Sequence, residues 1–182
     1  MMTHIFYNGT YSAEDARTRY LRLSGRDNGR VPQTTADARC IGNEFLRFYG
    51  RTMDLAQTYT EGRVPAGVLD GSFAMKIVGL FAPVGKAIDS GRMSDALDLL
   101  EDHAQAANLW LDAQLKNPRS YTQTIYNAVQ IAVNLAILYE PFLPQTAQRL
   151  RDRLGFANAW QFSSIPAGTV LVDPPGSTIR PA

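Results

Sequence analysis

The chain has almost none of the residues that build metal sites or disulfide frameworks. Its 182 residues include one cysteine, Cys40, and two histidines. A single cysteine excludes an internal disulfide, and two histidines leave little for a metal site. We therefore expect no metal, no catalytic cysteine and no cofactor. The scarcity of cysteine also fits a reducing, cytoplasmic setting.

An excess of charge of one sign is missing as well. The 18 lysines and arginines nearly balance the 17 acidic residues, which leaves a formal net charge of +1. Proteins that coat nucleic acid indiscriminately neutralise many phosphates, so this balance argues against that class. It remains compatible with a local basic patch, and we expect no DNA partner.

Long hydrophobic segments are also absent. The most apolar run, residues 128–138, contains Gln130 and Asn134 and is too short to span a bilayer. The first residues, "MMTHIFYNGTYS", have neither the basic nor the apolar region of a signal peptide. We therefore expect no membrane partner and interpret residues 128–138 as part of a buried helix.

Stretches with helical periodicity make up most of the chain. Apolar residues recur at spacings of three and four, which is the pattern of amphipathic helices. Polar or small residues at the predicted starts, such as Ser12, Thr34 or Thr35, and Ser94, are typical N-caps. Helices are predicted at about residues 12–25, 34–60, 72–89, 94–117, 119–140 and 144–155.

Two prolines, Pro141 and Pro144, interrupt the most hydrophobic of these stretches. A proline inside a helix removes a backbone donor and clashes with the preceding turn. The first turn of a helix tolerates proline, so Pro144 fits the start of a new helix. We therefore predict that one central, largely buried helix ends here and that a more polar helix begins.

The order of these elements predicts an all-α fold. Short connections between long helices favour an antiparallel bundle, which we place at residues 34–155. Residues 1–33 form a predicted linker element with one short helix. Residues 156–182 are rich in proline and glycine and form a predicted extended tail that packs on the bundle.

Several stretches resemble, in a consistent order, the anticodon-binding helical bundle of methionyl-tRNA synthetases, which are class I synthetases. The proline-broken turn and following helix are matched by "LYEPFLPQTAQRLRDRLG". An arginine-containing helix before a Gly-x-(Val/Ile)-Pro turn is similar to "RTMDLAQTYTEGRVP". The family's Asn-x-Tyr helix resembles "AQAANLWLDAQLKN". This resemblance implies the anticodon-binding type of bundle and tRNA as a partner.

The family's catalytic motifs, His-x-Gly-His and Lys-Met-Ser-Lys-Ser, are not found in the chain. The resemblance therefore implies a free-standing, non-catalytic tRNA-binding module and not an enzyme. Such a module would act in trans with a synthetase or with another enzyme that uses aminoacyl-tRNA.

The resemblance also assigns residues. An Asn and an Arg one helical turn apart read the anticodon in the family, and alignment on "EGRVP" places these positions at Arg47 and Arg51. Asn43 lies on the same helix face one turn earlier. The family's Pro-Trp pair, whose Trp stacks on a base, falls at Lys116 and Asn117. The implied tRNA-binding residues are therefore Asn43, Arg47, Arg51, Lys116 and Asn117, with the aromatic platform missing.

Each of these residues also has a purely structural interpretation. Arg47 can pair with Glu44 and Arg51 with Asp54 on a solvated helix face, and Lys116 can interact with its helix dipole. The lost Trp and the near-neutral charge keep a second function open, a protein–protein interaction module that retained the bundle and lost RNA binding. A third, an enzyme with a new site in the bundle, is disfavoured by the few histidines, cysteines and paired carboxylates.

Overall fold

A computed structural model describes residues 41–116, 120–157 and 159–171 of the chain. This part contains five helices and no strands, which confirms the predicted all-α fold. The helices are α2 (Asn43–Thr60), α3 (Gly71–Asp89), α4 (Met93–Lys116), α5 (Tyr121–Tyr139) and α6 (Pro144–Leu154). The predicted helix at residues 12–25 and Cys40 lie outside the described residues, and the domain division stays a prediction.

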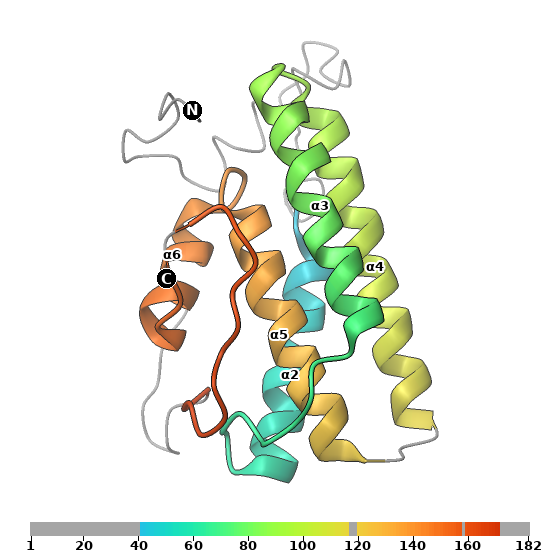
Figure 1. Cartoon of the computed structure of the whole chain (residues 1–182), viewed down its shortest axis with the longest axis vertical. Coiled ribbons are helices and arrows are strands. Elements are labelled where there is room, and N and C mark those ends of the chain that lie inside the picture. Colours follow the sequence, from blue (N-terminus) through green and yellow to red (C-terminus); the bar gives the residue numbers. More distant parts are fainter. Residues whose placement is uncertain (1–40, 117–119, 158, 172–182) are drawn as a thin grey trace, which may run out of the picture.

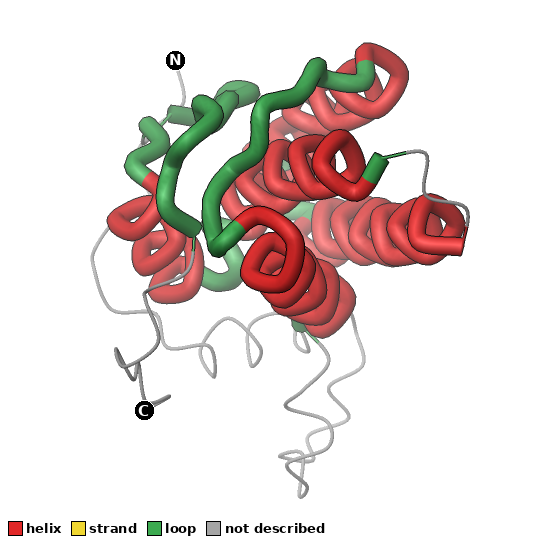
Figure 2. Tube along the Cα trace, turned by 90° about the horizontal axis from the view of Figure 1, so that it is seen from below, coloured by secondary structure: helices red, strands yellow, loops and turns green. Residues whose placement is uncertain are grey.

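Consecutive helices run in opposite directions, so that α2 and α4 point one way while α3 and α5 point the other (Figure 1). Viewed from below the bundle, the helices enclose a common interior, and loops cover one side (Figure 2). Helix α5 contacts α2, α3, α4 and α6. Nearly all of its residues from Thr124 to Tyr139 are buried, as predicted for the central helix.

Local sequence signals explain most of the helix ends. The Asp70 side chain accepts hydrogen bonds from the backbone N–H groups of Ser72 and Phe73 at the start of α3. Ser120 caps α5 in the same way. Helix α6 begins at Pro144 and ends at Gly155, whose φ of 70° is left-handed. The predicted break at the prolines is therefore confirmed.

Two predicted helix starts are wrong. Helix α2 begins at Asn43 instead of Thr34 or Thr35, because Gly42 has a left-handed φ of 74° that a continuous helix cannot contain. Helix α4 begins at Met93, so Ser94 lies inside the first turn and is not the cap.

The described part of the tail, residues 156–157 and 159–171, lies along the bundle next to α5 (Figure 1). The Asn134 side chain donates to the Ser163 carbonyl at 2.7 Å and accepts from the Ser163 N–H at 2.8 Å. One turn earlier, Gln130 makes the same pair of bonds with Ile165, at 2.9 and 2.8 Å. These two amides in the apolar helix thus satisfy backbone groups of an extended segment that belongs to no sheet.

Helix α3 is long and apolar enough to cross a membrane by length and composition, a test that core helices of globular bundles also pass. In the fold, Ile77, Leu80 and Val84 face the interior and are buried. Met75 and Val78 lie on the outer side and are exposed. The absence of a membrane partner stays a prediction from the sequence.

Candidate nucleic-acid interface

Helix α2 carries three of the residues that the sequence assigns to tRNA binding. Asn43 and Arg47 are exposed and lie one helical turn apart. The Arg47 side chain is 59% exposed, and its Nη1 lies 3.7 Å from the Glu44 carboxylate. This loose intrahelical pair matches the structural interpretation of Arg47, and it leaves most of the guanidinium accessible to a ligand.

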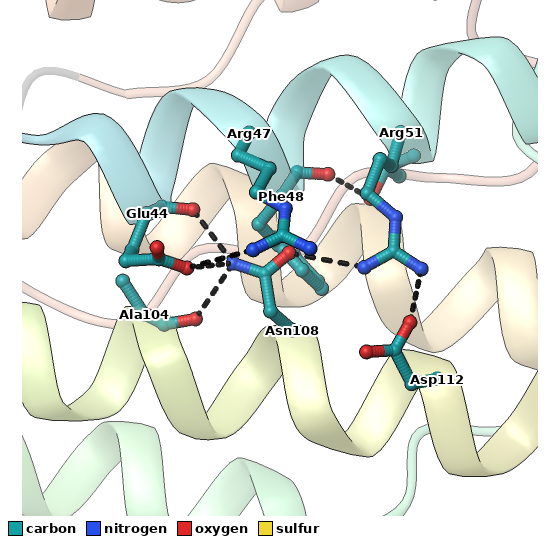
Figure 3. Close-up of polar contacts among 8 residues, drawn as sticks. Glu44, Arg47, Phe48, Arg51, Ala104, Asn108 and Asp112 are labelled. Atoms are coloured by element: carbon teal, nitrogen blue, oxygen red, sulfur yellow. Dashed lines mark hydrogen bonds and ion pairs between the residues drawn. The ribbon is translucent and has the colours of Figure 1, made fainter.

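Arg51 lies in a different environment. Its side chain is 27% exposed, and its Nη2 lies 2.5 Å from an oxygen of Asp112 on α4. Its Nη1 also donates to the Asn108 side-chain oxygen at 3.2 Å. The partner is therefore on the neighbouring helix, where the sequence suggested Asp54 on the same helix. Arg51 connects α2 to α4 (Figure 3).

Asn108 is the centre of this network and is only 3% exposed. Its side-chain nitrogen donates to the Glu44 carbonyl and to the Glu44 carboxylate, both at 2.9 Å, and to the Ala104 carbonyl at 3.2 Å. Its oxygen accepts from Arg51 (Figure 3). Glu44 is thereby fixed in the position from which it contacts Arg47. The network holds the exposed face of α2 in a defined orientation.

Sequence reasoning missed Asn108 and Asp112. They lie 57 and 61 residues from Arg51 along the chain, so the contact depends on how α2 and α4 are aligned. One signal was available, because Asn108 interrupts an otherwise apolar stripe between Ala107 and Leu111. Buried polar side chains in such positions are hydrogen-bonded as a rule.

One further assigned residue, Lys116, lies at the end of the bundle where α4 finishes. Lys116 is the last residue of α4 and is exposed. Asn117 lies outside the described residues. The structure thus places Asn43, Arg47 and Arg51 on one helix, with Lys116 farther along the neighbouring helix. A carboxylate, Asp112, lies between these cations and is paired with Arg51.

A half-buried acid supports the start of α2. Glu101 on α4 accepts the Gly42 N–H at 2.7 Å. Burial raises the pKa of the Glu101 carboxyl, and the hydrogen bond from the Gly42 N–H opposes this effect. The pKa of Tyr139 is also raised, first by its own burial and then by the adjacent Glu101.

This acid predicts a pH-dependent stability. A carboxyl whose pKa is higher in the folded state than its ordinary 4.5 binds protons more tightly when folded. We expect the free energy of unfolding to fall as the pH rises from about this value through the folded pKa. Glu101→Gln should flatten this part of the profile in urea denaturation at several pH values. Glu61→Gln on the exposed surface is the control, and an unchanged slope in Glu101→Gln would contradict the assignment.

Within the described residues, no group of three or more His, Cys, Asp or Glu side chains could hold a metal ion. The arrangement offers instead an amide, a guanidinium and an ammonium on the surface. These groups donate hydrogen bonds and positive charge, which suits phosphates and base edges.

No protein-family model matches the chain. A methionine–tRNA ligase of Bacillus cereus strain AH187 is 35% identical over 126 aligned residues, which cover 64% of this chain and 23% of the relative. A methionine–tRNA ligase of Bacillus mycoides strain KBAB4 is also 35% identical, over 122 residues, 62% of this chain and 22% of the relative. The chain therefore spans less than a quarter of the length of these relatives.

Solved structures show the same fold. The apo form of Mycobacterium tuberculosis methionyl-tRNA synthetase superimposes with a TM-score of 0.66 at 23% identity, covering 89% of this chain and 38% of that one. The same enzyme bound by methionyl-adenylate gives 0.65 at 21% identity. Sequence and fold together confirm the predicted resemblance: the chain carries a helical bundle like the C-terminal domain of methionyl-tRNA synthetases.

Proposed function

We propose that the chain binds tRNA through the face formed by α2 and the C-terminal end of α4. The observation that carries this proposal is the 35% identity, over 126 residues, to a methionine–tRNA ligase, an enzyme whose name specifies tRNA as its substrate. In this proposal the bundle contributes binding and not catalysis, because the family's catalytic motifs are not found in the chain. It acts in trans, in the cytoplasm, with a synthetase or another enzyme that uses aminoacyl-tRNA.

The geometry divides the assigned residues into two groups. Asn43 and Arg47 are exposed and can donate to phosphates or base edges, and Lys116 adds a cation farther along the face. Arg51 is held by Asp112 and Asn108, so its role is to position α2 on α4. Asn117 stays in the proposed site on the sequence alignment alone.

The test is a binding titration of the full chain against total tRNA at two salt concentrations. Wild-type protein should bind more weakly at the higher salt, because phosphate contacts release counterions. The double variant Arg47→Ala/Lys116→Ala should bind more weakly at low salt. When log K is plotted against the logarithm of the salt concentration, the slope of the double variant should be smaller in magnitude by about 1.5. Each phosphate contact contributes ~0.7–0.9 to this slope.

Arg92→Ala is the matched control. Arg92 pairs with Asp95 three residues on and is 54% exposed, which closely parallels the Arg47–Glu44 pair. It lies before α4, at the opposite end of that helix from Lys116. We expect this variant to bind like the wild type. Equal losses of affinity in Arg92→Ala and in Arg47→Ala/Lys116→Ala would show non-specific charge attraction and contradict the proposed face.

A protein–protein interaction module is the second candidate. The pairing of Arg51 with Asp112 and of Arg47 with Glu44 favours it, because these contacts reduce the positive charge available for RNA. The same titration separates the two. Wild-type protein that fails to bind any tRNA at low salt would leave the interaction module as the better explanation.

A further inference from the structure

Helices α2 and α4 finish, and α5 begins, at the same end of the bundle (Figure 1). Two tyrosines stack on each other there, one near the end of α2 and one at the start of α5. The ring centroids of Tyr59, in the last turn of α2, and Tyr121, the first residue of α5, are 4.4 Å apart. The ring planes are within 7° of parallel. Tyr121 is half-buried against the core, whereas Tyr59 is 48% exposed. One ring therefore supports the other, and the supported ring keeps an accessible surface.

Other aromatic contacts in the described part differ from this pair. Phe45 and Tyr139 are also stacked, with centroids 5.0 Å apart, but both rings are fully buried. Trp160 meets the ring of Phe81 edge-on at 81°. Of the described stacked pairs, the tyrosines at the end of α2 are the one with an exposed ring.

The helix ends hold both rings in place. After Tyr59 the chain turns through Glu61 and Gly62, and the Gly62 N–H bonds to the Ala56 carbonyl at 3.0 Å. Thr60 donates its hydroxyl to the carbonyls of Ala56 and Arg63. Tyr121 follows directly on the N-cap of α5. The fold already holds both rings in place, so a ligand that stacks here loses little affinity to the entropy of ordering them.

We propose that Tyr59, backed by Tyr121, is a stacking platform for an unpaired base of the bound RNA. This inference rests on the proposed function and names the part of the RNA that this end of the bundle binds. A base in a duplex has both faces covered, so the platform selects a single-stranded loop. Stacking requires no excess of positive charge, which suits a chain with a net charge of +1.

The experiment uses the full chain and a hairpin RNA that carries 2-aminopurine at successive loop positions. Stacking of this fluorescent base on an aromatic ring quenches it, so at least one loop position should lose fluorescence on binding. A fully paired duplex of equal length should bind more weakly. A signal that is unchanged at every loop position of the wild-type complex would overturn the platform, whatever the variants do.

Variants separate stacking from other roles of the residue. Tyr59→Leu keeps apolar bulk but removes the ring, and we expect about tenfold weaker binding with an unchanged salt slope. Tyr59→Phe keeps the ring and should bind within about twofold of wild type. Trp160→Leu removes a half-buried ring from a different part of the surface and should not change the affinity. Thermal unfolding of each variant checks that the bundle is intact.

The outcomes distinguish this inference from the proposed function. Wild-type binding that survives equally in Tyr59→Leu would overturn the platform and leave tRNA binding in place. Loss of binding in both Tyr59→Phe and Tyr59→Leu would assign the effect to the hydroxyl and also overturn stacking. If the wild type binds neither the hairpin nor total tRNA at low salt, both the stacking platform and the proposed tRNA binding are contradicted.

Discussion

Replacing Gln130 and Asn134 together with leucine is expected to lower the free energy of unfolding by about 3–5 kcal/mol and to loosen the tail around residues 163–165. Each amide makes two hydrogen bonds to the backbone of one tail residue, Ile165 or Ser163. Leucine leaves the N–H and C=O groups of both residues without these partners, at about 1–3 kcal/mol for each buried group. The total loss of stability is limited because water reaches the loosened segment, and hydrated backbone groups need no protein partner.

Urea denaturation measures the stability, and limited proteolysis within residues 159–167 reports the loosened part of the tail. Exposed glutamines on other helices, Gln57 and Gln105, provide the matched control. Their replacement by leucine should change the free energy of unfolding by less than about 0.5 kcal/mol. A Gln130→Leu/Asn134→Leu protein that is as stable and as protease-resistant as the wild type would show that the amides do not hold the tail.

The second large effect is expected at the ion pair between Arg151 on α6 and Glu140 at the end of α5. Arg151 is 8% exposed and also donates to the Gln148 side chain at 2.8 Å. Arg151→Met removes the cation and leaves the Glu140 carboxylate, 12% exposed, without it. Removing one member of a buried pair costs about 3–5 kcal/mol.

A double-mutant cycle tests this explanation. Glu140→Met together with Arg151→Met removes both charges, and we expect most of the lost stability to return, because apolar replacement of a whole buried pair is often neutral. Arg149→Met on the exposed side of α6 should have little effect. If Arg151→Met alone lowers the free energy of unfolding by less than about 1 kcal/mol, the pair does not anchor α6.

Local signals in the sequence were sufficient for most of the fold. Pro144 and Gly155 bound α6 as predicted, since their backbone preferences act without help from the rest of the chain. Leu97, Leu100 and Leu111 on the buried face of α4 follow the general spacing that predicts amphipathic helices. The start of α2 was missed because the left-handed geometry of Gly42 ends any continuous helix directly before Asn43.

Features that depend on packing between distant segments could not be read from the sequence. Gln130 and Asn134 served only to exclude a membrane span, and their bonds to the tail became visible in the structure. The resemblance assigned Arg51 to tRNA binding, and its interhelical contact with Asp112, 61 residues away, became visible in the structure. The stacking of Tyr59 on Tyr121 depends on where two helices end in space. Periodicity shows which face is buried and does not show which residues meet.

These assignments explain how a near-neutral bundle could bind RNA. The Asn108 network fixes the α2 face, Arg47 and Lys116 supply accessible charge, and Tyr59 offers a ring. A few positioned contacts of this kind do not require the large positive charge of non-specific nucleic-acid binders.

Ultraviolet cross-linking of total tRNA to the full chain, followed by mass spectrometry of the attached peptides, tests the central claim most directly. We predict cross-linked peptides from residues 43–60, with Tyr59 among the modified positions, and from the end of α4. Cross-links confined to α3 or α6, or no cross-linked complex at low salt, would contradict tRNA binding by the α2–α4 face.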